Sequence, residues 1–275
     1  MTRAGRGITL ALLLTALAAC TASSDNDGAG GDLEDPGDCI PVDMAVSPEK
    51  LDLLTDLANT FNDSDRAEVD GDCIFVRVQR MSSGTGASLI ADDWPDPDVN
   101  GPRPVIWSPA SSAWGAVVNQ RKADLGEEPV APPGTPFMLT PLVIAMPEPM
   151  ANALGYPETP IGYADILRLA NDPAGWGAFG HPEWGPFRLG KTNPNFSTSA
   201  LHATVAQYYA AAGKTGDLTL EDLNRPEVDQ FARGVESSVV HYGDITNTFL
   251  NNLSRADAAA PGSRTCRRWR SRRSR

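Results

Sequence analysis

The sequence has few of the side chains that most often perform catalysis. Its 275 residues include three histidines, scattered at His181, His202 and His241, and four cysteines. It lacks the G-x-S-x-G, H-E-x-x-H, G-x-x-x-x-G-K-[ST] and paired C-x-x-C patterns of nucleophile, zinc, phosphate and redox sites. The sequence therefore indicates no enzyme, metal site or cofactor. We interpret His202 as a solvated or capping helix residue and His241 as a weaker candidate for a binding site.

Long apolar runs and an overall positive charge are also missing. The formal net charge is −12, although residues 264–275 carry seven arginines and no acid. A body this acidic argues against a nucleic-acid partner and is typical of a soluble surface. Beyond the first twenty residues, no apolar run is long enough for a transmembrane helix. The length allows one large domain or two smaller ones.

Residues 1–20 have the layout of an export signal. Two arginines precede the apolar run Ile8–Ala19, which is too short for a permanent membrane span. The L-A-A-C tetrapeptide Leu17–Cys20 resembles the lipobox of bacterial lipoproteins, whose cysteine is lipidated and becomes the mature N-terminus. A plain secretory signal with a chance cysteine is the alternative. Because residues 21–38 are rich in Ser, Gly and Asp, we expect a flexible tether and a lipid anchor on the outer face of the cell membrane.

Two of the remaining cysteines stand at the start of strand-like runs. Cys39 begins C-I-P-V-D-M-A-V and Cys73 begins C-I-F-V-R-V. Export permits disulfides, and adjacent parallel strands would bring these two sulfurs together. We therefore predict a Cys39–Cys73 disulfide. A metal site is the weaker option because no histidine or second C-x-x-C pair lies near either residue.

Strand-like and helical patterns alternate along the chain, which predicts an α/β fold with a parallel sheet. Strand-like runs near residues 40–46, 73–79 and 104–107 are each followed by a helical pattern. A further strand-like run, Phe137–Met146, contains Pro141, and a proline inside a strand marks an edge, a bend or a crossing between sheets. We place a domain crossing near Thr140. The expected organisation is residues 39–139 as lobe 1, residues 140–257 as lobe 2 and residues 258–275 as an anomalous arginine-rich tail.

Three expected helix starts lack the acidic residue that normally favours this position. They lie at Ser82–Thr85, Ser108–Ser112 and Asn193–Ser199, whose backbone N–H groups and hydroxyls we expect to bind the ligand. Backbone N–H groups at such a start are free for an outside acceptor, which is how anion sites are built, although each alone also fits an ordinary capped helix. All three follow a strand, so we expect them to meet at strand C-terminal ends, where open α/β sheets bind ligands.

Two of these starts precede the proposed crossing and one follows it, which predicts a ligand clamped in an interdomain cleft. We expect the Trp114 side chain to form part of the wall of this pocket and Lys191 to add positive charge to it. The predicted ligand-binding residues are Ser82, Ser83, Gly84, Thr85, Ser108, Ser111, Ser112, Trp114, Lys191, Asn193, Asn195, Ser197 and Thr198.

Five segments together resemble the extracellular solute-binding lipoproteins of actinobacteria. They are I-P-V-D-M-A-V-S-P-E-K, S-S-G-T-G-A, V-I-W-S-P-A-S-S-A-W, G-H-P-E-W-G-P-F-R-L-G-K-T-N-P and V-V-H-Y-G-D. These proteins resemble type 2 periplasmic binding proteins, and many carry a von Willebrand factor A domain. The resemblance covers roughly residues 39–257. It implies two α/β lobes joined by hinge strands that close on a ligand.

The resemblance stops near residue 257. Such a fold needs its chain to cross back and complete the first lobe, whereas here the arginine-rich tail follows and the D-x-S-x-S metal motif of von Willebrand domains is absent. We therefore expect a C-terminally truncated or frame-shifted product. The leading hypothesis is a solute-binding lipoprotein that delivers a small polar or anionic ligand to an ABC permease. The alternatives are a non-transport surface or envelope module of the same type, or a truncated non-functional product.

Overall fold

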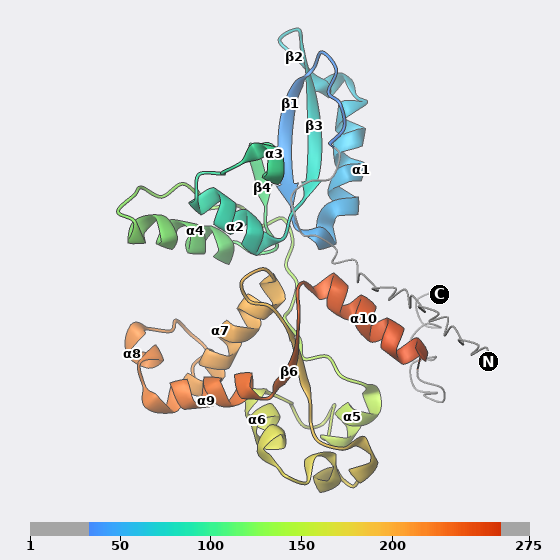
Figure 1. Cartoon of the computed structure of the whole chain (residues 1–275), viewed down its shortest axis with the longest axis vertical. Helices are drawn as coiled ribbons and strands as arrows, with labels where there is room; N and C mark the ends of the chain where they lie inside the picture. The colour runs from blue at the N-terminus through green and yellow to red at the C-terminus, as the bar shows by residue number, and fades with distance from the viewer. Residues whose placement is uncertain (1–32, 260–275) are drawn as a thin grey trace, which may run out of the picture.

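Residues 33–259, the part that the computed structural model describes, form a mixed α/β structure with two separate sheets. The α/β class expected from the sequence is confirmed. Figure 1 shows one sheet in the upper part of the molecule and the other in the lower part, with a long segment passing between them. We call residues 33–136 the N-terminal unit and residues 147–259 the C-terminal unit. The expected signal peptide and most of the tether and tail lie outside the described residues.

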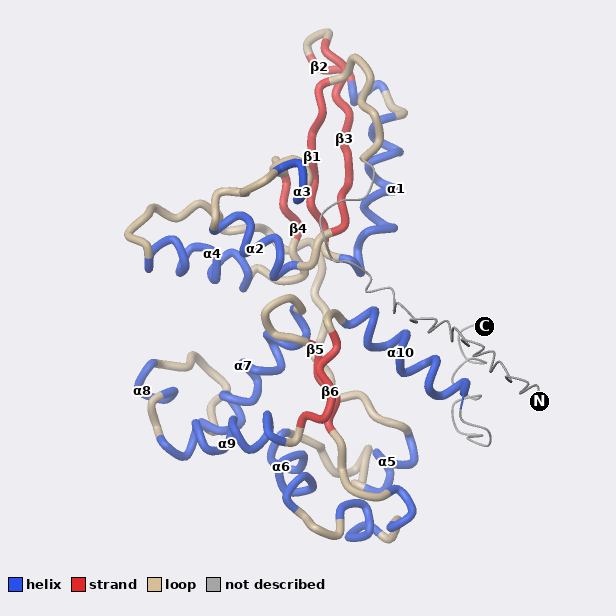
Figure 2. Tube along the Cα trace, viewed as in Figure 1, coloured by secondary structure: helices blue, strands red, loops and turns tan. Residues whose placement is uncertain are grey.

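The N-terminal unit is built on a four-stranded sheet in the order β2-β3-β1-β4. Strands β1 (Ile40–Val46), β3 (Asp72–Arg80) and β4 (Ile106–Ser108) are parallel, and the short edge strand β2 (Glu68–Val69) is antiparallel to β3. Figure 2 shows α1 alongside β1 and β3, and α2 and α4 below β4. The helices of this unit are α1 (Leu51–Asn62), α2 (Ser83–Ala91), α3 (Pro97–Asn100) and α4 (Ala113–Asp124).

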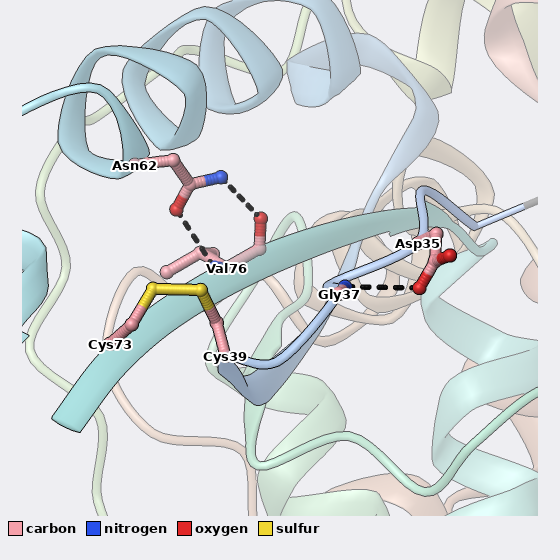
Figure 3. The surroundings of a disulfide bond; sticks show 6 residues. All are labelled: Asp35, Gly37, Cys39, Asn62, Cys73 and Val76. Atoms are coloured by element: carbon pink, nitrogen blue, oxygen red, sulfur yellow. Dashed lines mark hydrogen bonds between the residues drawn. A yellow bond between two sulfur atoms is a disulfide. The ribbon is translucent and has the colours of Figure 1, made fainter.

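A disulfide joins the beginnings of β1 and β3, as predicted (Figure 3). In the parallel register Ile40 lies opposite Ile74, so the preceding Cys39 and Cys73 also face each other, with Cα atoms 4.6 Å apart. Nearby, the Asn62 amide receives a hydrogen bond from Val76 N at 2.8 Å and donates one to Val76 O at 3.0 Å. The end of α1 is thereby tied to β3 beside the covalent link.

The core of the N-terminal unit lies between the sheet and helices α2 and α4. One buried cluster contains Ala45, Met81 and Trp94, and a second contains Ala87, Trp114 and Val118. Small residues on α2 allow the sheet and α4 to approach closely. This packing fixes the positions of the first residues of α2 and α4, which face the C-terminal unit.

The C-terminal unit contains a two-stranded parallel sheet formed by β5 (Leu189–Thr192) and β6 (Val239–Gly243). Buried apolar side chains include Ile166, Trp176 and Val235. Thr219 and Asp222 form a capping box at the start of α8, since each side chain bonds the backbone N–H of the other. The helices are α5 (Glu148–Ala153), α6 (Tyr163–Asn171), α7 (Thr198–Ala212), α8 (Leu220–Leu223), α9 (Pro226–Ser237) and α10 (Thr246–Ala259).

The expectation of a strand at Phe137–Met146 is wrong. This segment links the two units but contains no strand. Its apolar side chains are largely exposed, with Leu139 at 91% and Val143 at 70%. Pro136 and Pro141 remove two backbone donors, and a strand-forming sequence becomes a strand only where a neighbouring strand accepts its hydrogen bonds.

Candidate functional site

A cleft of about 580 Å³ lies between the two units. The beginnings of α1, α2 and α4 line it from the N-terminal unit, and the beginnings of α7 and α10 from the C-terminal unit. The connecting segment 134–142 forms part of its wall. The cleft therefore lies at the carboxyl ends of β1, β3, β4, β5 and β6, where open α/β sheets commonly bind ligands.

Hydroxyl groups at the start of α2 form one side of the cleft. Ser82 has an extended backbone and acts as the N-cap, its Oγ accepting from Thr85 N at 3.2 Å. Ser83 Oγ accepts from Ala110 N at 3.0 Å, which fixes the neighbouring loop. Both serines are buried and line the cleft, whereas Thr85 is absent from its lining. The sequence Ser-Ser before a run of small residues thus caps the helix and holds the loop after β4.

Lys50 also fixes the loop after β4, through hydrogen bonds from its side chain. It is 7% exposed, and its Nζ donates to Ser108 O at 2.9 Å, Ser108 Oγ at 2.7 Å and Pro109 O at 2.9 Å. Burial lowers the pKa of this lysine, and the neighbouring Glu49 carboxylate partly opposes the shift. Sequence reasoning missed Lys50 because it reads as an ordinary basic residue in the first turns of a helix.

The C-terminal unit presents a second group of hydroxyls. Thr192 Oγ1 lies 2.9 Å from both Ser197 Oγ and Ser199 Oγ. Ser199 Oγ in turn lies 2.8 Å from Thr246 Oγ1 at the start of α10. Sequence reasoning included Ser197 and Ser199 in the turn Asn193–Ser199 but missed Thr246, because no local signal shows that β6 places α10 beside α7.

Within residues 33–259, hydrogen bonds join the two units across the cleft. Gly84 N donates to Phe196 O at 3.1 Å, Trp114 Nε1 donates to Thr198 Oγ1 at 2.7 Å, and His202 Nε2 pairs with Ser111 Oγ at 2.8 Å. The interpretation of His202 as a merely solvated or capping residue is therefore wrong, since it lines the cleft. The side chain of His241 lies outside what the structure describes.

At Gly84 the two units approach so closely that there is no room for a side chain. A Cβ atom built on it would lie 1.9 Å from the carbonyl oxygen of Asn195. The N–H group of Gly84, expected to be open to a ligand, is bonded to the C-terminal unit in this structure. Ser82 and Ser83 of this expected helix start line the cleft, but the tertiary contact decides which donors of the segment face it.

The structure divides the predicted binding residues into two sets. Those that line the cleft are Ser82, Ser83, Ser108, Ser111, Ser112, Ser197 and Thr198. Those outside its lining are Gly84, Thr85, Trp114, Lys191, Asn193 and Asn195. Trp114 is buried in the N-terminal core, because the first turn of α4 directs its ring inward.

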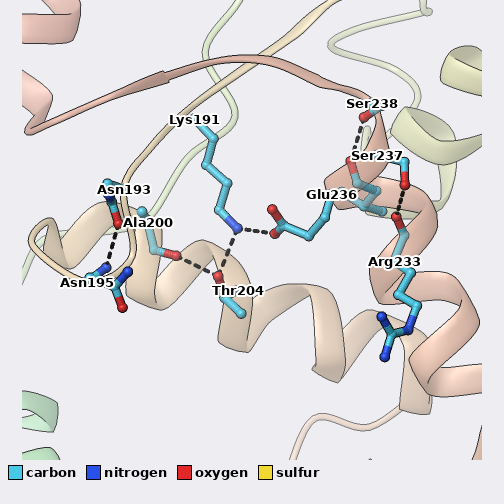
Figure 4. Close-up of polar contacts among 10 residues, drawn as sticks. Lys191, Asn193, Asn195, Ala200, Thr204, Arg233, Glu236, Ser237 and Ser238 are labelled. Atoms are coloured by element: carbon cyan, nitrogen blue, oxygen red, sulfur yellow. Dashed lines mark hydrogen bonds and ion pairs between the residues drawn. The ribbon is translucent and has the colours of Figure 1, made fainter.

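The Lys191 side chain is buried inside the C-terminal unit and does not line the cleft. Figure 4 shows its side chain reaching from β5 to Glu236 on α9 and Thr204 on α7. Its Nζ is ion-paired with Glu236 and donates to Thr204 Oγ1 at 2.8 Å. The charge expected to attract a ligand is compensated inside the unit.

The cleft is thus lined mainly by hydroxyl, backbone and apolar groups, with Glu49 and Lys50 at one edge and His202 on α7. Neutral donors fixed by a folded framework can hold a polar or anionic group without titrating themselves. Within residues 33–259, no group of three or more His, Cys, Asp or Glu side chains is arranged to hold a metal ion. In the same range, no helix has both the length and the apolar character needed to cross a bilayer.

Comparisons with known proteins give one result on the family. Neither the curated proteins nor the solved structures contain a significant match to this chain. The profile of a family described as bacterial extracellular solute-binding protein matches residues 42–262, which is most of the chain and includes both units and the cleft. The chain belongs to the bacterial extracellular solute-binding protein family.

Proposed function

We propose that this chain captures a small polar or anionic ligand in the cleft between its two units and delivers it to an ABC-type transporter. The two units are the lobes of a type 2 periplasmic-binding-protein arrangement, and a lipid on Cys20 anchors the chain outside the membrane. The observation that carries the proposal is the hydroxyl-lined cleft, whose walls are formed by residues of both units. Family membership supports the solute-binding role.

Ser112 is the clearest candidate for direct contact with the ligand. It lines the cleft and is exposed, and its Oγ makes no hydrogen bond to any other described residue. Ser82 and Ser83, in contrast, already accept backbone hydrogen bonds that hold α2 and the loop after β4. Ser112 therefore offers a hydroxyl that a ligand can use without breaking the framework.

A thermal-shift screen of the purified chain against oxyanions, sugars and amino acids tests ligand binding. A ligand at 100 times its dissociation constant adds about 2.7 kcal/mol to stability, which is a clear rise in melting temperature. We expect Ser112→Ala to weaken binding about tenfold, the equivalent of one hydrogen bond of about 1.4 kcal/mol. The unliganded variant should melt like the wild type. Thr215→Ala, at an exposed loop residue outside the cleft lining, serves as the control.

Two outcomes would contradict this proposal. If no ligand of the three classes stabilises the chain, the proposed solute-binding role is contradicted. If Ser112→Ala binds the ligand with unchanged affinity, the ligand does not contact the start of α4. Transport is tested separately by deleting the gene, which should abolish cellular uptake of the ligand identified. Anchoring is tested with Cys20→Ala, which should shift the chain from the membrane fraction to the soluble fraction; continued membrane association would disprove the lipid anchor.

A further inference from the structure

Lys50 is a buried cation in the lining of the cleft, and its hydrogen-bond partners in the described part of the chain are all uncharged. Its three donors go to the carbonyl and hydroxyl oxygens of Ser108 and to the carbonyl oxygen of Pro109. Its Nζ also lies 5.3 Å from the centre of the Phe137 ring, in the connecting segment. Within residues 33–259 it forms no ion pair with a carboxylate.

Other buried lysines of this chain have their charge compensated. Lys122 and Lys191 are also buried, and each is ion-paired with a carboxylate. The carboxylate nearest to Lys50 in the sequence is Glu49, which is exposed and accepts a hydrogen bond from Ser47 Oγ at 2.7 Å. Solvent screens such an exposed charge, whereas a buried ammonium acts through a lower dielectric. Burial lowers the pKa of Lys50, so an anion in the cleft would stabilise its charged form.

The Ser108 hydroxyl is left with a proton to donate. An ammonium group can only donate, so Ser108 Oγ is the acceptor of its 2.7 Å hydrogen bond with Lys50 Nζ. No other group in residues 33–259 bonds this oxygen, and Ser108 is partly exposed in the lining of the cleft. Hydrogen bonds polarise one another, so a hydroxyl that accepts from a cation is a stronger donor. Ser83 Oγ likewise accepts, from Ala110 N at 3.0 Å, and keeps its proton for a further partner.

We propose that the Ser108 hydroxyl, polarised by the Lys50 ammonium, selects a fully deprotonated oxyanion group as the part of the ligand that binds beside the end of β4. Such a group only accepts hydrogen bonds, which matches hydroxyls whose own acceptor position is already used. Ser108 makes the contact, and Lys50 is a positioning residue because its three donors are used within the chain. This inference rests on the proposed function and narrows its ligand from polar or anionic to anionic.

The test is isothermal titration calorimetry of the purified full chain with sulfate and with dimethyl sulfone. Both probes have a tetrahedral sulfur and oxygens that only accept hydrogen bonds, but only sulfate is charged. We expect saturable binding of sulfate, with dimethyl sulfone weaker by about tenfold or more. Ser108→Thr and Ser108→Val have side chains of nearly the same shape. The valine variant should bind sulfate about tenfold or more weakly than the threonine variant, because it lacks the hydroxyl.

Lys50→Met tests the contribution of the charge. It should weaken sulfate binding and reduce the preference for sulfate over dimethyl sulfone, whereas a merely structural defect in the loop would weaken both probes alike. Lys122→Met is the control, because Lys122 is a buried lysine of the same unit that is ion-paired and lies outside the lining of the cleft. This variant should bind sulfate as the wild type does.

Three results would overturn the proposal. They are equal binding of the two probes to the wild type, equal sulfate affinity of Ser108→Thr and Ser108→Val, and an unchanged preference for sulfate in Lys50→Met. If Lys50→Met does not fold, the first two comparisons still decide. A lack of sulfate binding, while another ligand of the thermal-shift screen stabilises the chain, would contradict this inference and leave the proposed function intact. A chain that binds none of those ligands would instead contradict the proposed function itself.

Discussion

At the scale of single residues, several polar side chains act by fixing backbone rather than by facing solvent. Lys50 directs its three donors at the loop after β4, and Asn62 bonds both polar backbone groups of Val76. Asp222 combines a helix cap with an ion pair. The partners of Lys50 and Asn62 lie 14 to 59 residues away in the sequence, whereas Asp222 bonds Thr219 and Lys214 within eight residues.

Asp222 gives a prediction on pH. Hydrogen bonding from Lys214, and then from the backbone and hydroxyl of Thr219, holds the pKa of the Asp222 carboxyl far below its usual range. A lowered folded-state pKa means that this carboxylate stabilises the fold above the unfolded pKa of about 3.9 and loses its contribution as the pH falls below it. Asp222→Asn should therefore be less stable than the wild type at pH 6, and the difference should narrow steadily from about pH 4 downward.

Chemical unfolding between pH 2.5 and pH 7 measures this effect. Asp217→Asn is the matched control, because Asp217 is an exposed acid in the loop before α8. A stability difference between Asp222→Asn and the wild type that stays constant over the whole range would rule out this role of the carboxylate.

At the scale of elements, the N-terminal unit depends on the pairing of β1 with β3. These strands are parallel, so they lack the short hairpin that often joins antiparallel neighbours, and α1 makes the connection. The Cys39–Cys73 disulfide closes this β-α-β segment at its open end. Backbone hydrogen bonds also join β1 to β3 along this register, and the Asn62 amide ties α1 to β3.

Removing the disulfide should destabilise this unit. The cysteines are 34 residues apart, and loop closure of this length corresponds to about 3–4 kcal/mol of unfolded-state entropy. The double variant Cys39→Ala, Cys73→Ala should lose about that amount in urea unfolding at neutral pH. A reducing agent should lower the stability of the wild type by a similar amount and leave the double variant unchanged. Equal stability of the wild type and the double variant would show that the link contributes nothing.

At the scale of the whole molecule, the two units are held together by contacts from α2 and α4 to α7. Gly84 lies against the backbone of Asn195 and Phe196, and the Trp114–Thr198 and Ser111–His202 hydrogen bonds add two further contacts. Residues from both units therefore line the cleft. The approach of the units at Gly84 depends on a position with no side chain.

Gly84→Ala should separate the units without unfolding them. Its Cβ would meet the Asn195 carbonyl oxygen at 1.9 Å, and a backbone atom cannot rotate away as a side chain does. Alanine in a helix is itself favoured over glycine by about 1 kcal/mol, so α2 should remain folded. We expect small-angle scattering to give a larger radius of gyration while far-ultraviolet circular dichroism is unchanged.

Gly115→Ala provides the control for this prediction. Gly115 also lies in a helix of the N-terminal unit, but a Cβ there would meet only Ala131 at an ordinary 3.7 Å. It should leave the radius of gyration at the wild-type value. A scattering curve for Gly84→Ala that superimposes on the wild type would show that this contact does not set the distance between the units.

The sequence by itself determined what depends on local patterns. The alternation of strands and helices, the pairing of Cys39 with Cys73 and the hydroxyl-rich helix starts could all be predicted, because each is encoded within a few residues or one β-α-β step. Only the tertiary structure decided which of those hydroxyls line the cleft. Lys50 and His202 enter the site, and Lys191 leaves it, through partners 13 to 91 residues away. The run at residues 137–146 is left without a strand for the same reason: its conformation depends on a neighbour that local sequence does not specify.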